Sequence, residues 1–152
     1  MRSTIHAAAG LVLASGLVAG AALAADPEPI RLAQAEAAPV EHPVSYEPEQ
    51  AERGEGRYKK ECGDCHGKDL RGGLLGGPPL RGVSFEQKFA DGAPASGLYS
   101  FISGLMPPNS PGRFSPTAYA DIMAYILKQN GFKAGAPLPS DIDALDALIM
   151  EK

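Results

Sequence analysis

Five consecutive residues, Cys62-Gly63-Asp64-Cys65-His66, constrain this chain of 152 residues more than any other feature. Two thiols three residues apart can each form a thioether bond with a vinyl group of one haem. A histidine directly after the second thiol is then close enough to ligate the iron from one face. The spacing therefore predicts one covalently attached haem c, bonded to Cys62 and Cys65, with His66 as an iron ligand.

Three other interpretations of this motif fit the sequence less well. A thioredoxin-like redox pair needs a strand before it and a helix after it, whereas a predicted helix precedes this motif and a glycine-rich loop follows it. A zinc site needs a fourth ligand, and the remaining histidines are His6 and His42, both far from the motif in the sequence. A plain disulfide would leave His66 without a role.

The rest of the sequence predicts an all-α fold of three to five short helices joined by long loops. Gly and Pro make up 32 of the 152 residues, well above average usage, and the glycines and prolines of residues 67–83 exclude regular structure there. We see no good strand signal. Helical periodicity, N-caps and prolines in first turns predict helices over residues 48–62, 84–90, 96–104 and 116–130, and a last short helix capped by Ser140 with Asp143 at the capping-box position.

The ends of the chain differ in composition from its middle. Arg2 is the only formal charge of residues 1–25, and from Ile5 to Ala25 the chain is apolar or small apart from His6 and Ser15. Ala22-Leu23-Ala24 fits a signal-peptidase site. We therefore expect residues 1–24 to be a cleaved signal peptide and the protein to be periplasmic, with an uncleaved membrane anchor as the alternative. Export places both cysteines in an oxidising compartment, where a covalent cofactor persists.

After the signal, the sequence predicts an acidic, mobile linker over residues 25–47, a folded domain over residues 48–133 and a C-terminal tail over residues 134–152 with a short amphipathic helix. The formal net charge of the whole chain is −4, and the mildly basic centre lies between two acidic ends. No polybasic surface of the kind that binds nucleic acid is present in the sequence, so we expect no nucleic-acid partner.

An iron that only carries electrons needs a second axial ligand, and the sequence offers four candidates: Met106, Met123, Met150 and His42. Met106 precedes Pro107-Pro108, and a residue before proline is pushed into an extended conformation, which suits a stiff loop that holds a thioether at the iron. Met123 lies on the apolar stripe of its predicted helix, where core packing is its expected role. We therefore predict Met106 as the second ligand.

These features together resemble the class I monohaem cytochromes c over residues 48–133. Gly54 and Tyr58 fall where the first helix of that family crosses the last one, and Ile122 and Tyr125 fall on the matching face of the last helix. The resemblance implies a small cytochrome c fold around one haem. It also implies that the carbonyl of Pro78, within Gly77-Pro78, accepts a hydrogen bond from His66, and that Met106 is the distal ligand.

A narrower resemblance links the chain to the haem domains and cytochrome partners of PQQ-dependent alcohol dehydrogenases. It rests on Leu70-Arg71-Gly72-Gly73, Gly77-Pro78-Pro79-Leu80, Met106-Pro107-Pro108 and the segment Asp121 to Leu127. This resemblance implies an electron-transfer protein rather than an enzyme. It also implies a separate periplasmic dehydrogenase as electron donor, with a cytochrome or terminal oxidase of the respiratory chain as acceptor.

Three roles therefore remain open for such a haem protein: a diffusible carrier, a bound haem subunit of a larger dehydrogenase, and a haem enzyme such as a peroxidase, which Met106 argues against. A binding module with a disulfide and no haem is a fourth alternative. We expect an apolar shell around the haem, made of Leu80, Phe85, Leu98, Phe101, Ile102, Tyr119 and Ile122. We also expect a basic rim that steers acidic partners, made of Lys59, Lys60, Lys68, Arg71, Arg81 and Lys88.

Overall fold

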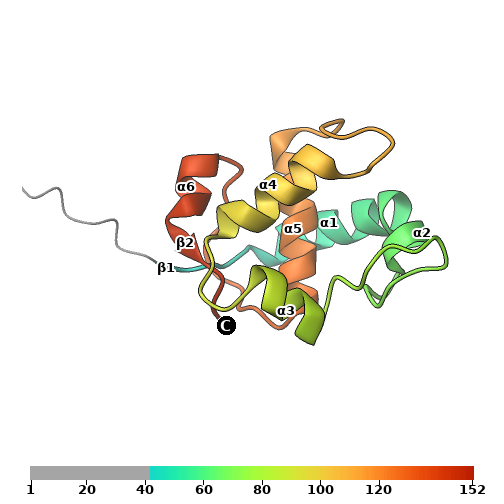
Figure 1. Ribbon diagram of the computed structural model, residues 1–152. Coiled ribbons are helices and arrows are strands. Elements are labelled where there is room, and N and C mark those ends of the chain that lie inside the picture. Colours follow the sequence, from blue (N-terminus) through green and yellow to red (C-terminus); the bar gives the residue numbers. More distant parts are fainter. Residues whose placement is uncertain (1–41) are drawn as a thin grey trace, which may run out of the picture. The chain divides into compact units, whose positions relative to one another are not determined.

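The computed structural model of the chain describes residues 42–152 (Figure 1). The predicted signal peptide, residues 1–24, lies outside the described residues, as do residues 25–41 of the predicted linker. In the part of the chain that is described, no helix has the length and apolar character needed to cross a membrane.

The described chain is predominantly helical, as the sequence predicts, and it has six helices rather than three to five. The sixth helix is a short turn formed by the haem motif itself, for which the sequence predicts no helix. Two strands of two residues each were also not expected. In chain order the elements are β1 (His42–Pro43), α1 (Pro48–Glu61), α2 (Gly63–His66), α3 (Val83–Phe89), α4 (Ala95–Leu105), α5 (Pro116–Gln129), α6 (Ile142–Asp146) and β2 (Leu148–Ile149).

The longest helices begin where local sequence signals place them. Pro48 opens α1, and the side chains of Glu47 and Gln50 form a capping box around its first turn. Ser115 caps α5 by accepting a hydrogen bond from the backbone N–H of Ala118 at 3.3 Å. The cap predicted for α6 is wrong, because Asp141 rather than Ser140 accepts the hydrogen bond from its first turn.

Helices α1 and α5 cross near the middle of the fold (Figure 1) and form its largest helix–helix contact. Gly54 allows this close approach, since a Cβ atom at that position would lie 1.8 Å from the carbonyl oxygen of Asp121. Arg53 makes two hydrogen bonds of 2.9 Å to the carboxylate of Asp121, and the rings of Tyr58 and Tyr125 pack 5.3 Å apart. The crossing predicted for these two helices is therefore observed.

The two ends of the described chain pack on the core rather than extending from it. β1 pairs with β2 in parallel, His42 opposite Leu148, and Val44 and Tyr46 are buried just before α1. The folded part therefore begins before residue 48, where the sequence predicts its start. Backbone hydrogen bonds tie this segment to the C-terminal residues, among them Val44 to Ile149 at 2.8 Å.

The C-terminal segment packs on the core at the same end of the fold as β1. Leu138, Leu145 and Met150 are buried, and α6 packs against α4. The side-chain amide of Gln50 donates to the carbonyl of Leu138 at 2.9 Å and accepts from its N–H at 2.7 Å. These contacts place β1, β2 and α6 at the end of the fold away from α2 (Figure 1).

Candidate haem site

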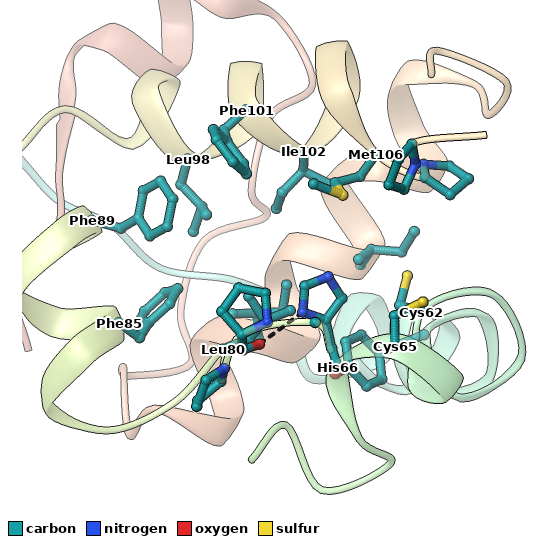
Figure 2. A pocket seen from close by; sticks show the side chains of 18 of the residues that line it. Cys62, Cys65, His66, Leu80, Phe85, Phe89, Leu98, Phe101, Ile102 and Met106 are labelled. Carbon is teal, nitrogen blue, oxygen red and sulfur yellow. Dashed lines mark hydrogen bonds between the residues drawn. The ribbon is translucent and has the colours of Figure 1, made fainter. Parts of the chain in front are cut away.

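A largely apolar cavity of about 540 Å³ lies between α2, α3, α4 and α5, a size usual for a cofactor site. The five residues that the sequence singled out all line it: Cys62, Cys65, His66, Pro78 and Met106. Figure 2 shows the two cysteines at one end of this cavity. The structure therefore brings together in one place residues that are up to 44 positions apart in the sequence.

The two thiols reach the cavity because the haem motif is helical. The N–H groups of Cys65 and His66 both bond to the carbonyl of Cys62, at 3.2 and 2.9 Å, and this turn carries both sulfur atoms to the same side. The cysteines are not joined to each other. Burial, with a smaller effect of Glu61, raises the pKa of the Cys62 thiol to about 11, so this thiol is protonated at neutral pH.

His66 is buried, and its ring orientation is fixed by one hydrogen bond. Its Nδ1 donates to the carbonyl oxygen of Pro78 at 2.8 Å, drawn as a dashed line in Figure 2. A carbonyl oxygen only accepts, so the proton of the neutral ring is on Nδ1 and the lone pair on Nε2 is free for a metal. The hydrogen bond that the resemblance implied is therefore present.

The glycine before Pro78 lets this loop approach the motif. A Cβ atom on Gly77 would lie 2.4 Å from the carbonyl oxygen of Cys65, too close for any side chain. Any larger residue at this position would move Pro78 away from His66, and the imidazole would lose the acceptor that orients it.

Met106 lies across the cavity from His66 (Figure 2). It follows the last turn of α4 in an extended conformation, with φ −120° and ψ 143°, as expected for a residue before proline. The hydroxyl of Tyr119 donates to the Met106 carbonyl at 2.9 Å, which fixes the backbone of this loop. The thioether and the Nε2 of His66 are thus the two soft donor groups on facing walls.

The other three ligand candidates lie elsewhere. Met123 and Met150 are buried in the core and do not line this cavity. His42 is exposed on β1, at the end of the fold away from α2 (Figure 1). Of the four candidates, Met106 is the one that lines the cavity together with His66.

The apolar shell forms largely as expected, with one correction. Leu80, Phe85, Leu98, Phe101, Ile102 and Ile122 line the cavity. Tyr119 does not, because its ring packs on Phe114 and its hydroxyl bonds to the Met106 loop. Sequence reasoning missed Leu75, Phe89 and Lys88 among the lining residues. Phe89 was detectable, since it follows Phe85 at helical spacing.

The expected basic rim is partly neutralised by neighbouring carboxylates. Lys59 pairs with Glu55 at 2.6 Å, Lys60 with Glu61 at 3.6 Å, and Arg71 with Asp69 at 3.5 Å. Such exposed pairs add little stability, but they reduce the field that these bases present to a partner. In the part of the chain described here, Lys68, Arg81 and Lys88 form no ion pair with a carboxylate.

Comparison with known proteins places this site in a family. The model of the family described as cytochrome c oxidase, cbb3-type, subunit III, matches residues 49–126, just over half of the chain. This chain belongs to that family. It is a monohaem cytochrome c with covalently bound haem c, and its domain is that of an electron-transfer protein.

Two further comparisons add no assignment to a family. A solved structure, the sulfane dehydrogenase SoxCD from Paracoccus pantotrophus, is similar to this cytochrome with 21% identity and a TM-score of 0.43, over 76% of this chain. This cytochrome spans 60% of the length of that chain. No curated protein matches the sequence.

The residues of the cavity fit haem c. The thiols of Cys62 and Cys65 are free to form thioethers, and Nε2 of His66 has its lone pair available for the iron. The wall is mostly apolar, as a porphyrin requires. When bound, the haem supplies a one-electron couple between ferric and ferrous iron, while the chain supplies attachment, ligands and shielding from water.

Proposed function

We propose that this cytochrome is exported to the periplasm and carries single electrons through a haem c ligated by His66 and Met106. It accepts electrons from a periplasmic dehydrogenase of the quinoprotein type. It passes them to the respiratory chain through another cytochrome or a terminal oxidase. The family to which it belongs is described as an oxidase subunit, which supports the respiratory end of this proposal.

The observation that carries the proposal is the placement of a nitrogen and a sulfur donor on facing walls of one cavity (Figure 2). When both axial positions are filled by the chain, no open position remains for a substrate such as peroxide. The iron also changes its geometry little between oxidation states. Both properties favour electron transfer over a haem enzyme, and His/Met ligation raises the reduction potential relative to two histidines.

The surroundings of these two ligands support the same role. The hydrogen bond from His66 to Pro78 orients the imidazole and increases its donor strength. The apolar wall excludes water and so favours the less charged, reduced site. Among the lining residues, Leu75 keeps 71% of its surface exposed and follows the fully exposed Leu74, which gives a partner an apolar contact beside the site.

The C-terminal helix bears on the choice between a carrier and a bound subunit. Leu145 of α6 is fully buried and the helix packs on α4 of the same chain, whereas Ile142 at its start stays 43% exposed. Only part of the apolar surface of α6 is therefore left for docking on a dehydrogenase. This supports a diffusible carrier, with the tightly bound haem subunit as the second candidate.

A reduction assay with purified holoprotein tests the proposal. A PQQ-dependent alcohol dehydrogenase from the same cells, given its alcohol, should reduce this cytochrome by one electron per haem, read from the reduced c-type absorption bands. The control omits the alcohol. A dehydrogenase that reduces an artificial dye but leaves this cytochrome oxidised would contradict the proposed donor. Copurification of the two proteins at both low and high salt would favour the subunit.

A further inference from the structure

We infer that Lys88 binds a haem propionate and that its positive charge raises the reduction potential of the haem. Lys88 was expected to belong to a rim that steers partners, and the structure places this exposed side chain on the lining of the cavity. The inference rests on haem c in this cavity and extends the proposed function to the control of its potential.

The chemistry of the haem fixes which end of the cavity receives the propionates. The two vinyl groups lie on one side of the porphyrin and the two propionates on the opposite side. Attachment through Cys62 and Cys65 therefore directs the carboxylates away from the cysteines. In Figure 2 the residues at the end opposite the cysteines are Phe85 and Phe89 of α3, with Phe101 of α4 nearby.

Lys88 is held at this end by two aromatic rings. Its Nζ lies 5.0 Å from the ring centroid of Phe89 and 4.4 Å from that of Phe101, and its side chain lines the cavity. Cation–π contacts of this kind hold a lysine in place while leaving its ammonium protons free to donate. The two rings thus direct a cation toward the edge where two carboxylates are expected.

The charge of Lys88 has no counter-charge within the described chain. It is the one lysine or arginine among the described lining residues. The lining carboxylate, Glu61, precedes Cys62 and pairs with Arg113. Glu86, on the same helix as Lys88, pairs with Lys152 of the C-terminus. Helix α4, which packs against α3, carries no charged residue. A propionate would supply the missing partner.

The expected effect on the potential follows from charge. An ionised propionate stabilises ferric iron, and Lys88 offsets this by neutralising the carboxylate and keeping it ionised. Without the lysine, the uncompensated carboxylate favours the oxidised form. The carboxyl pKa also rises, so that reduction takes up a proton onto the propionate and the potential falls as pH increases through that pKa.

Potentiometric titration of the holoprotein from pH 5 to pH 8 at low ionic strength tests the inference with Lys88→Gln. At pH 7 we expect the equilibrium between reduced and oxidised forms to shift about tenfold toward the oxidised form, which equals about 59 mV for one electron. A pH dependence absent from the natural protein should appear. Lys88→Arg should retain the natural potential. Lys133→Gln, which removes the same charge at an exposed residue outside the cavity lining, should change little.

A Lys88→Gln variant with the natural potential and pH profile would overturn the inference, as would an equal shift in Lys133→Gln. A second measurement needs no variant. In natural holoprotein with 13C-labelled propionate carboxyls, NMR should show at least one of them titrating well below the ordinary range of a free carboxyl, and two ordinary titrations would contradict the inference. Neither readout uses the dehydrogenase, so a failed donor assay leaves this result standing.

Discussion

At the scale of single residues, the haem site depends on backbone geometry that short motifs encode. The spacing of Cys62, Cys65 and His66 is local, and the proline after Met106 fixes the extended conformation of that residue. These positions could therefore be predicted from the sequence alone. Lys88 and Leu75 could not be placed in the cavity, because their positions depend on how α3 and the glycine-rich loop fold back over the motif.

The ligand prediction for Met106 can be tested by exchanging methionines for leucine, which has a similar volume and no sulfur. Met106→Leu should abolish the weak far-red absorption of the Met–Fe(III) bond and lower the reduction potential, because a thioether stabilises ferrous iron. The measurement is an absorption spectrum of the oxidised protein together with a potentiometric titration.

Met123→Leu is the matched control for this ligand test. Met123 is fully buried outside the cavity, and a volume-conserving exchange there changes stability by less than about 1.5 kcal/mol. The far-red band should therefore remain. An intact band in Met106→Leu, or its loss in Met123→Leu, would refute the assignment of the ligand.

At the scale of elements, local signals predicted the helices better than their partners. Prolines and capping residues predict where α1 and α5 begin. The cap of α6 was misplaced by one residue, since Ser140 and Asp141 are both good capping residues and the sequence alone does not choose between them. The strands β1 and β2 could not be found, because a two-residue strand carries no periodic pattern.

The crossing of α1 and α5 predicts opposite effects for two glycines of the same helix. Gly54→Ala would place a Cβ atom 1.8 Å from the carbonyl oxygen of Asp121, and this backbone atom can move only if the helices separate. We expect the free energy of unfolding to fall by about 3 kcal/mol or more, measured by chemical denaturation of the holoprotein.

Gly56→Ala is the control, because a Cβ atom there would meet nothing within 4 Å. Alanine favours the helical conformation, so this variant should gain up to about 1 kcal/mol of stability. A Gly54→Ala protein as stable as the Gly56→Ala protein would show that the two helices do not cross as described.

The packing of α6 is tested by two leucines that differ in burial. Leu145→Ala should lower the free energy of unfolding by about 2–5 kcal/mol, because Leu145 is fully buried against the core. Leu74→Ala should stay within about 0.5 kcal/mol of the natural protein, since Leu74 is fully exposed. Equal denaturation midpoints for both variants would mean that α6 does not pack on the core.

At the scale of the whole molecule, the haem is expected to complete the core. The cavity of about 540 Å³ has mainly apolar walls, and a chain with no Trp and 7% aromatic residues has few large side chains to fill it. With this composition, burial needs the help of a cofactor, a metal or a cross-link, and composition alone does not choose among the three. The sequence could not predict that both ends of the described chain would join the core, because Val44 and Leu138 lie in segments without regular periodicity.

Replacing both cysteines tests this dependence. The double variant Cys62→Ser and Cys65→Ser should contain no covalently bound haem, checked by haem staining after denaturing electrophoresis. It should also unfold at lower denaturant concentration, because the apolar walls lose their partner. Each single variant keeps one thiol and should keep one thioether. Covalent haem in the double variant would disprove attachment through this motif.

The pairing of β1 with β2 at the end of the fold away from α2 (Figure 1) has a practical consequence. His42, the first described residue, lies on that side, remote from the turn that carries the cysteines. A protein immobilised on an electrode through a group attached at residue 42 would present its cysteine-bearing side to the electrolyte. It should therefore exchange electrons with freely diffusing mediators faster than with the electrode itself.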